Sequence, residues 1–327
     1  MKVIVIHPDT GIACALSNAL EALEDVHVQA RAGDLSAAYH LAEHLQPDAA
    51  LVSGAFCEVP ELDVMRLLFR GLGMSAILLA QNDRGVEHLR GRAARLGWSL
   101  VTADASPARL HSAIQRAVST RPVRTGLTAG SAAGTFDPDR LVLIGSSTGG
   151  IDALSKVLGS FPAECPPTVI VQHTGAGFSE GLARLLDRQT APTVVEARHR
   201  EAIRPGHVFI APGNTHHLTI SPRDRRLVFR ASSPSGGHRP SVDQLFYSAL
   251  PIASSVTAAI LTGMGRDGAH GLAALRAAGA TTIAQDRGTS VVYGMPRVAK
   301  ELGGVELELP LPKIGAAILS SCRRRAA

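Results

Sequence analysis

Short apolar runs alternate with amphipathic segments along almost the whole of this 327-residue chain. Within the first 118 residues, five strand-sized runs are separated by stretches whose apolar residues recur at spacings of three and four, as in helices with one buried face. This alternation is typical of a parallel sheet covered by helices on both faces. We expect strands at 3–6, 26–30, 49–52, 76–79 and 100–101, and helices at 13–23, 35–44, 64–68, 86–96 and 108–118.

Residues 119–139 interrupt the alternation. The stretch STRPVRTGLTAGSAAGTFDPD is rich in Gly, Ala, Ser, Thr and Pro and has no sustained period, which predicts a flexible linker. A second alternating pattern begins at Arg140 and continues nearly to the end of the chain. The sequence therefore predicts an α/β protein of two domains: a five-stranded parallel domain over 1–118 and a doubly wound, mostly parallel-sheet domain over 140–327.

Composition excludes several classes of protein. The longest apolar runs are strand-sized, so we expect no membrane insertion. The start, MKVIVIHPDT, enters a strand pattern at once without the features of a signal peptide, and the four cysteines form no CxxC pair. These observations predict a cytoplasmic protein without disulfides. Only His216 and His217 are adjacent among thirteen histidines, and no HExxH spacing occurs, so neither a metal nor another cofactor is expected.

Charge is distributed unevenly between the two halves. Residues 1–120 contain ten basic and thirteen acidic residues, whereas residues 121–327 contain 23 basic and 15 acidic residues, a net charge of +8. The basic half suits an acidic protein surface. Aromatic residues make up only 4% of the chain and cannot supply a stacking platform, so no nucleic-acid partner is expected.

A glycine-rich turn opens the second domain. The apolar run Leu141–Ile144 leads into GSSTGG at 145–150 and then into a helical pattern. Such a turn directs backbone N–H groups and a helix N-terminus at one point, which can hold a phosphate or an oxyanion. A P-loop would need a lysine at the end of the turn, but none occurs before Lys156, and the acidic residue of a dinucleotide site is also missing.

A histidine and an aspartate occupy comparable places. His173 follows the apolar run Thr168–Val171, and Asp267 lies in the turn after Ala258–Leu261. Since the carboxyl ends of parallel strands meet at one edge, a serine, a histidine and an aspartate there form the parts of a nucleophilic triad. Each alone has an ordinary structural explanation, as a helix cap, a surface histidine or a turn residue. The pattern by itself leaves catalysis and structure open.

Six segments of the second domain closely resemble the chemotaxis protein-glutamate methylesterases, the CheB family. They occur in the family's order and span about residues 140–320: LVLIGSSTGGIDAL, VIVQHTGAGFSEGLARLL, HVFIAPGNTHH, GHRPSVDQLF, AILTGMGRDGAHGL and AQDRGTSVVYGMPRVAKELG. The resemblance implies that Ser147, rather than Ser146, is the nucleophile, with His173 as the base and Asp267 as its partner. It also implies that Thr148 and Met264 help to hold the tetrahedral intermediate. Further positions that resemble site-framing residues are His216, Arg239, Asp243, Tyr293 and Met295.

The same family carries an N-terminal response-regulator receiver with a flavodoxin-like fold, and the first domain resembles it in pattern but not in chemistry. Serine stands at the position of the phosphoacceptor aspartate, Ser53, and the other departures are His7-Pro8 for the acidic pair, Ala80-Gln81 for the Ser/Thr, and Ala103 for the lysine. Without an acceptor carboxylate no aspartyl phosphate can form, so we expect a pseudo-receiver. Whether this domain caps the esterase, docks other chemosensory proteins or answers a different signal stays open.

The resemblance implies hydrolysis of glutamate methyl esters on the cytoplasmic helical domain of methylated chemoreceptors, and also deamidation of glutamine. A mainly deamidating homologue would release ammonia rather than methanol. A non-catalytic scaffold would show a damaged triad, whereas all three residues are present. A nucleotide-binding module would be stabilised against heat by nucleotide, which we do not expect.

Overall fold

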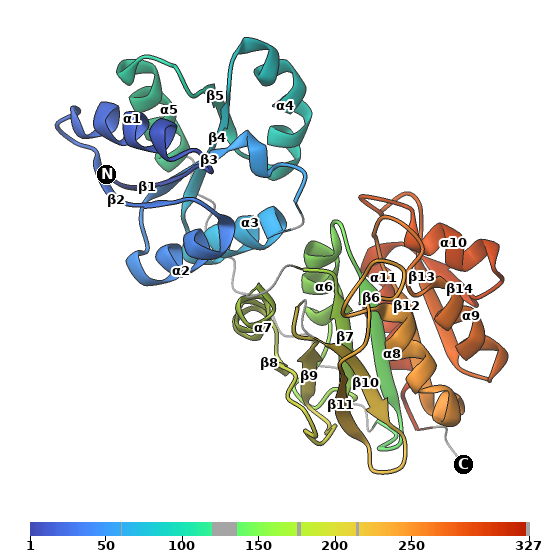
Figure 1. Ribbon diagram of the computed structural model, residues 1–327. Helices are drawn as coiled ribbons and strands as arrows, with labels where there is room; N and C mark the ends of the chain where they lie inside the picture. The colour runs from blue at the N-terminus through green and yellow to red at the C-terminus, as the bar shows by residue number, and fades with distance from the viewer. Residues whose placement is uncertain (60, 120–135, 175–177, 214–215, 325–327) are drawn as a thin grey trace. The chain divides into compact units, whose positions relative to one another are not determined.

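Five parallel strands form the sheet of the N-terminal unit, in the order β2-β1-β3-β4-β5 (Figure 1). The computed structural model describes residues 1–59, 61–119, 136–174, 178–213 and 216–324. The chain divides into two units, Met1–Gly126 and Leu127–Ala327. The strands of the first unit are β1 Lys2–Ile6, β2 His27–Ala32, β3 Ala49–Ser53, β4 Ser75–Ala80 and β5 Ser99–Thr102. Its helices are α1 Thr10–Glu21, α2 Leu35–Leu45, α3 Glu61–Leu72, α4 Asp83–Leu96 and α5 Pro107–Ser119, with the short 3-10 helix η1 Gly54–Phe56 after β3.

Alternate strand residues of this sheet face opposite sides, as the two-residue period of a strand requires. Val3, Val5 and Leu51 belong to one buried cluster with Leu16 of α1 and Ile114 of α5. Residues between them on the strands are equally buried against the other face, which is why the strands are apolar throughout. The strand order is that of the flavodoxin-like fold. The predicted five-stranded α/β domain is therefore confirmed, and the main difference is that α3 extends several residues beyond the predicted 64–68 at both ends.

The C-terminal unit is built on a seven-stranded sheet of order β14-β13-β12-β6-β7-β9-β8, in which every pair is parallel. Its strands are β6 Leu141–Ser146, β7 Thr168–Gln172, β8 Thr193–Glu196, β9 His207–Ile210, β12 Val256–Ile260, β13 Thr281–Gln285 and β14 Leu307–Leu309. The helices are α6 Gly150–Leu158, α7 Phe178–Gln189, α8 Val242–Ser248, α9 Ala269–Ala277, α10 Met295–Glu301 and α11 Leu311–Ser321, with a 3-10 segment η2 at Leu250–Ser255. The predicted doubly wound parallel sheet is confirmed.

An antiparallel hairpin, β10 His217–Ser221 and β11 Arg226–Arg230, stands apart from this sheet. No such hairpin was expected from the strand-helix alternation of the sequence. The hairpin packs on α8 through its buried residues, and the hydroxyl of Ser248 of α8 accepts a hydrogen bond from the amide of Ile220 at 2.9 Å. It thereby holds α8, whose first amides become important at the site.

The chain order reverses around β6. The connection through α6 leads from β6 to β7 on one side, whereas β12 lies on the other side of β6. Ligand sites of open parallel sheets form outside the carboxyl ends of the strands at such a reversal. The carboxyl ends of β12, β6 and β7 are therefore the place where a site is expected. Among the described helices, none is long and apolar enough to cross a membrane.

The predicted division into 1–118, 119–139 and 140–327 stays a prediction. Most of the proposed linker lies outside the described residues, which resume at Phe136. The last helix before that gap ends at Ser119, and the first strand after it begins at Leu141.

Candidate active site

Ser147 is the first residue after β6, and the backbone around it is tightly bonded. Its amide donates to the carbonyl of Thr262 at 3.0 Å, which ties the turn to the end of β12. Its carbonyl accepts from the amide of Gly150 at 2.7 Å, which closes the turn at the start of α6. Gly149 has φ 75°, a conformation that favours glycine, and a Cβ there would meet Val291. The GSSTGG sequence is therefore required by the shape of this turn.

The two serines of the turn have different surroundings. Ser146 is fully buried and donates its hydroxyl to Gln172 Oε1 at 2.6 Å. The Gln172 amide in turn donates to the carbonyls of Ser147 at 3.0 Å and of His173 at 3.1 Å. Ser147 is 7% exposed, and no hydrogen bond engages its hydroxyl within the described residues. The hydroxyl of Ser147, not that of Ser146, is thus the one available for chemistry.

His173 follows β7 beside this turn. Ser146 and Gln172 pair in the sheet, and the amide of His173 donates to the carbonyl of Ser146 at 3.0 Å, so Ser147 and His173 leave neighbouring strands at the same edge. The ring contacts Asp267 through Nε2, at 2.8 Å from Oδ2. Nδ1 is buried and has no hydrogen-bond partner among the residues that the structure describes. The network therefore assigns the proton to Nε2 and leaves Nδ1 as an acceptor.

Asp267 lies in the loop between β12 and α9, and its carboxylate accepts four hydrogen bonds. Besides Nε2 of His173, the donors are the hydroxyl of Ser241 at 2.7 Å and the amides of Val242 at 2.7 Å and Asp243 at 3.1 Å. Burial raises the pKa of Asp267, but the bond and charge of His173, followed by the bonds from Ser241 and Val242, outweigh burial and lower it overall. Asp267 is consequently ionised and holds the ring of His173.

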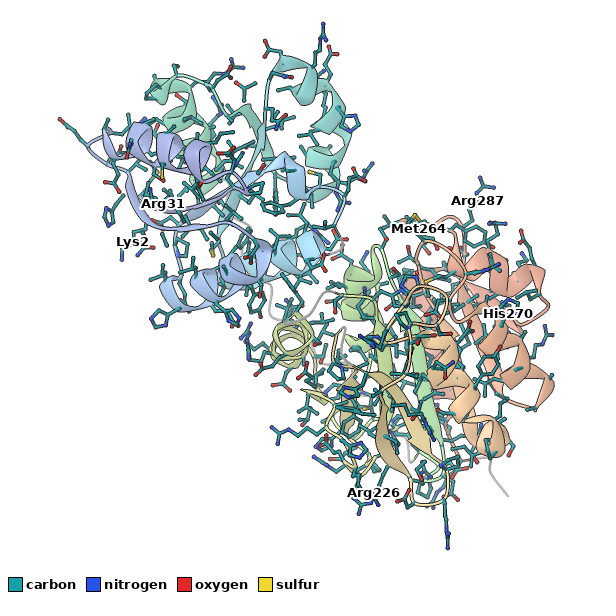
Figure 2. The ribbon with its side chains drawn as sticks, viewed as in Figure 1. Lys2, Arg31, Arg226, Met264, His270 and Arg287 are labelled. Carbon is teal, nitrogen blue, oxygen red and sulfur yellow. The ribbon has the colours of Figure 1, made fainter. Side chains whose placement is uncertain are left out.

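Two backbone N–H groups beside Ser147 remain available for an oxyanion. Within the described residues, no acceptor engages the amides of Thr148 and Met264, whereas the amide of Ser147 is bonded to Thr262. Gly263 brings the β12 loop against the turn: a Cβ on it would lie 2.8 Å from Cβ of Ser147. The side chain of Met264 is 72% exposed and points to the surface (Figure 2), so only its backbone can contribute.

Three of the five predicted framing residues lie in different settings. Tyr293 donates its hydroxyl to Glu308 of β14 at 2.5 Å, and burial, with the bond and charge of Glu308, raises the pKa of Tyr293 to about 12. Met295 is fully buried next to Gly263. The carboxylate of Asp243 accepts from the amide of Gly271 at 2.7 Å, while its own amide bonds Asp267.

The two remaining framing predictions are Arg239 and His216. Arg239 donates to the carbonyl of Ser232 at 3.2 Å. The ring of His216 stacks on Phe229 of β11, with centroids 5.8 Å apart, and it makes no bond to the three triad residues within the described part of the chain. Its neighbour His217 is instead linked to Asp267 through Ser241, since Nδ1 of His217 accepts from the amide of Ser241 at 3.2 Å. The role in substrate placement given to His216 stays a prediction.

Sequence reasoning missed four residues of this network. Gln172 joins the two strand ends, Ser241 bonds Asp267, and His217 fixes Ser241. The fourth, His238, lies parallel to the ring of His173 with 3.9 Å between centroids. A signal was present for Ser241, because Ser at the N-terminus of a helix pattern is a common cap, and it does accept from the amide of Gln244. For the others, only the fold brings the partners together.

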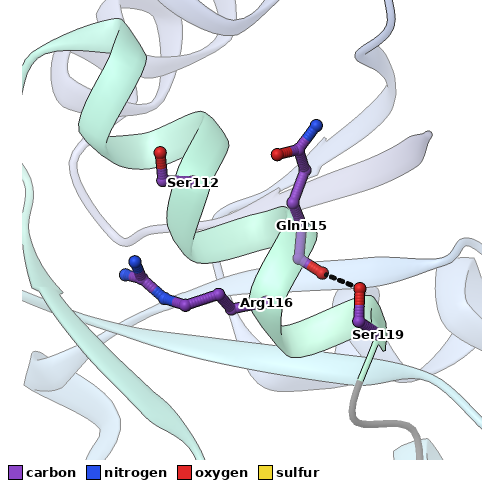
Figure 3. A pocket seen from close by; sticks show the side chains of 4 residues that line it. All are labelled: Ser112, Gln115, Arg116 and Ser119. Carbon is purple, nitrogen blue, oxygen red and sulfur yellow. Dashed lines mark hydrogen bonds between the residues drawn. The ribbon is translucent and has the colours of Figure 1, made fainter.

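Other parts of the structure offer less chemistry. A surface hollow of about 520 Å³ lies along α5 and is lined by Ser112, Gln115, Arg116 and Ser119 (Figure 3). The hydroxyl of Ser119 donates to the carbonyl of Gln115 at 2.8 Å, a bond within the helix itself. No group of three or more His, Cys, Asp or Glu side chains suited to hold a metal ion occurs among the residues with described positions. The carboxyl edge of β12, β6 and β7 is therefore the candidate site.

Several known proteins are similar to this chain. A family model described as CheB methylesterase matches residues 142–318. The chain is 39% identical to a protein-glutamate methylesterase/protein-glutamine glutaminase of Gluconobacter oxydans, in an alignment covering 99% of this chain and 97% of that protein. It is 38% identical to a protein of the same name from Agrobacterium fabrum, covering 97% and 95%. The crystal structure of the Thermotoga maritima CheB methylesterase catalytic domain superposes with a TM-score of 0.53 and 38% identity, covering 55% of this chain and 97% of that domain.

Proposed function

The chain belongs to the CheB methylesterase family of enzymes, and on that premise we propose that it hydrolyses glutamate methyl esters on chemoreceptors through Ser147, His173 and Asp267. The observation that carries this proposal is the state of the His173 ring. Its Nε2 is fixed by an ionised carboxylate, and its buried Nδ1 has no partner among the described residues. Ser147 leaves the neighbouring strand at the same edge of the sheet, and its hydroxyl is also unengaged within the described part of the chain. This is the arrangement that a general base needs.

In the acylation step, Nδ1 of His173 takes the hydroxyl proton of Ser147 as Oγ attacks the ester carbonyl. Asp267 stabilises the imidazolium that forms and keeps the proton on Nε2. The tetrahedral intermediate then expels methoxide, which takes the proton from Nδ1 and leaves as methanol. Proton transfer requires Oγ and Nδ1 to come within about 2.6–3.2 Å, a distance that often closes only when substrate is bound.

In the deacylation step, a water molecule replaces methanol. His173 takes one of its protons while the oxygen attacks the acyl-enzyme carbonyl, and the second tetrahedral intermediate expels Ser147 Oγ, which recovers the proton. The products are a glutamate carboxylate and free enzyme. In both steps the amides of Thr148 and Met264 would donate to the oxyanion, each such donor being worth about 10²–10³ in rate.

The same acyl-enzyme gives a second activity. If the substrate is a glutamine side chain, ammonia leaves instead of methanol, and the remaining steps are identical. The names of the two relatives described above include protein-glutamine glutaminase, which favours this addition.

The substrate would be the acidic helical cytoplasmic domain of a methylated chemoreceptor. The second half of the chain has a net charge of +8. At the rim of the site, Arg266 and Arg287 are exposed beside the exposed apolar side chains of Met264 and Val291. Such charges mainly raise the rate of encounter with an acidic partner. A cytoplasmic location stays a prediction.

We further propose that regulation does not depend on aspartyl phosphorylation of the N-terminal unit. Ser53 ends β3 where the acceptor would stand, and it is buried with its hydroxyl accepting from the amide of Ala55 at 3.3 Å. Beyond it, a Cβ on Gly54 would meet Leu89 of α4, so an apolar side chain fills this end of the sheet. His7, in place of a carboxylate, is buried and bonded to the backbone of Asp9. These residues offer neither an acceptor nor a Mg²⁺ site.

The catalytic proposal is tested with methylated chemoreceptor fragments and the full-length chain. Methanol release should fall by on the order of 10⁶-fold in Ser147→Ala, and ammonia release from a glutamine-containing receptor should fall with it. Ser155→Ala, on α6 with its hydroxyl bonded to Gln189, is the matched control and should retain activity. Release of methanol by Ser147→Ala at the wild-type rate would refute the assignment.

The regulatory proposal is tested with acetyl phosphate and Mg²⁺. The N-terminal unit should take up no acid-labile phosphate, and the rate of methanol release should change less than about twofold. Stoichiometric labelling with a parallel rise in activity would show that another carboxylate serves as the acceptor.

A further inference from the structure

The ring of His238 lies flat against the ring of His173. Their centroids are 3.9 Å apart and their planes differ by 2°. The other ring pairs recorded between described residues have centroids 5.8 to 6.0 Å apart, and most are tilted or edge-on. This full overlap is therefore particular to the histidine that the proposed mechanism uses as its base.

The backbone around His238 fixes it in this place. Ser235 and His238 exchange two backbone hydrogen bonds of 3.0 Å across a two-residue turn. Both central residues are glycines with positive φ, Gly236 at 58° and Gly237 at 86°, as a type I′ turn requires. The position of His238 is thus set by a rigid turn rather than by a free loop.

Both flanks of this turn are bonded into the network around Asp267. On one flank, Nε2 of His217 contacts the carbonyl of Ser233 at 3.0 Å, and its Nδ1 accepts from the amide of Ser241. On the other flank, Ser241 donates its hydroxyl to Asp267. The 233–243 segment therefore runs from buried His217, across the face of His173, to the carboxylate that holds His173.

A flat neighbour restricts what the His173 ring can do. The bond from Nε2 to Asp267 anchors one edge of the ring, but rotation about that edge would still carry Nδ1 out of line with Ser147. The stacked ring of His238 blocks this rotation on one face. Small displacements of a reacting group are costly, since 1 Å of misplacement can lower a rate about 10²-fold.

The charge on His238 matters as well, because His173 becomes positive during proton transfer. Burial lowers the pKa of His238, the charge of His173 lowers it further, and Asp267 opposes both effects. Those two side chains are the charged or titratable groups acting on His238 in the described structure. The lowered pKa favours the neutral form of His238 when His173 is charged, and a neutral ring avoids the repulsion that a second cation would bring.

We propose that His238 is a positioning residue for catalysis, which holds the ring of His173 with Nδ1 toward Ser147 and supports the imidazolium as a neutral stacked partner. This inference rests on the proposed triad function. It assigns no proton transfer to His238 itself.

Three substitutions separate stacking from charge. His238→Phe keeps a flat neutral ring and should retain kcat within about threefold of wild type. His238→Ala removes the ring and should lower kcat about 10- to 100-fold with KM changed less than about twofold. His238→Arg keeps a planar group but adds a permanent charge, so it should lower kcat and move the acid limb of the kcat/KM profile to lower pH by about one unit. The control is His207→Ala, which removes a histidine that stacks on Phe209. His207 is the first residue of β9, at the end away from the carboxyl edge, so kcat and KM should not change.

Two readouts make failure of this inference distinguishable from failure of the proposed function. The first is methanol release from methylated receptor, and the second is the rate at which a fluorophosphate reagent labels Ser147, which requires only an active triad. If wild type is labelled but releases no methanol, the substrate is wrong, and the order of labelling rates still decides the role of His238.

The inference is overturned if His238→Ala reacts within twofold of wild type, or if the Phe and Ala variants are equally impaired. It is also overturned if the acid limb of His238→Arg coincides with that of His238→Phe. Melting temperatures identify any variant that fails to fold. Should His238→Ala be such a variant, the comparison of Phe with Arg carries the test.

Discussion

Replacing Asp267 by asparagine should lower kcat for methanol release about 10³- to 10⁴-fold, although the two side chains have nearly the same shape. The size of this effect follows from the hydrogen bonds that the carboxylate accepts. Oδ2 receives Nε2 of His173 and the amide of Val242, and Oδ1 receives the hydroxyl of Ser241 and the amide of Asp243. All four partners are donors, and an amide side chain offers only one acceptor atom.

Each orientation of the new amide has a definite cost. If its NH₂ faces His173, the amide of Val242 loses its acceptor and the ring must move its proton to Nδ1, where it can no longer accept from Ser147. If its NH₂ faces Ser241, the amide of Asp243 is orphaned and the imidazolium loses its negative partner. A buried donor without an acceptor costs about 1–3 kcal/mol, and loss of the tautomer accounts for about 10⁴ in kcat in related triads. Stability should therefore fall by about 1–3 kcal/mol in either case.

The assay compares methanol release and urea unfolding for wild type, Asp267→Asn and Asp224→Asn. Asp224 is the matched control, since it is a half-exposed aspartate in the turn of the β10–β11 hairpin, paired with Arg200 and Arg226 at 3.9 and 3.8 Å. The control should differ from wild type by less than about 0.5 kcal/mol and twofold in kcat. A kcat within tenfold of wild type for Asp267→Asn would mean that the carboxylate does not orient the base, and the mechanism given above would be wrong.

Three further predictions follow from the same contacts. Gly263→Ala places a methyl group 2.8 Å from Cβ of Ser147, so kcat should fall at least about 10²-fold in steady-state assays, and an unchanged rate would show that the turn can move aside. Gln172→Ala leaves a buried hydroxyl and two carbonyls without their partner, so urea unfolding should show a loss of about 3 kcal/mol, whereas a loss under 1 kcal/mol would contradict that network. Because the pKa of Asp267 is lowered in the folded state, its stabilisation is complete above the ordinary value of 3.8 and is lost as pH falls through the folded value. Wild-type stability should consequently fall more steeply than that of Asp267→Asn from about pH 5 to about pH 3, and parallel curves would show that this aspartate is not the group responsible.

Much of the architecture could be predicted from local patterns. The apolar runs of the first domain are continuous because both faces of a parallel sheet are covered, and the helix spacings are regular because each helix buries one face. The same reasoning located the serine turn at 145–150, His173 and Asp267 after the ends of strands, and the parallel sheet brings those ends together at β12, β6 and β7. The choice of Ser147 over Ser146 came from the family resemblance. Element boundaries were less accurate, since caps such as Asp9 and Asn82 extend helices beyond their apolar residues.

The β10–β11 hairpin shows why other features could not be predicted. Its two strands pair with each other and not with the main sheet, so a strand-helix alternation contains no trace of it. Yet the first residue of β10 is His217, which bonds the amide of Ser241. The local sequence gives no basis for deciding whether His216 or the adjacent His217 contacts Ser241. The two side chains differ in direction, and only the packing of the hairpin on α8 decides which of them meets Ser241.

By itself the amino-acid sequence determined the two α/β domains, the glycine turn at 145–150 and the types of residue at the strand ends. These features depend on periodicity and on backbone conformations that few residues adopt. Only the tertiary structure decided which side chains meet. The four donors around the carboxylate of Asp267 come from positions as far away as His173, and the ring of His238 reaches His173 across 65 positions of chain. Contacts between such distant segments depend on the packing of the whole unit, and for that reason the support of the His173 imidazole becomes visible only once the chain is folded.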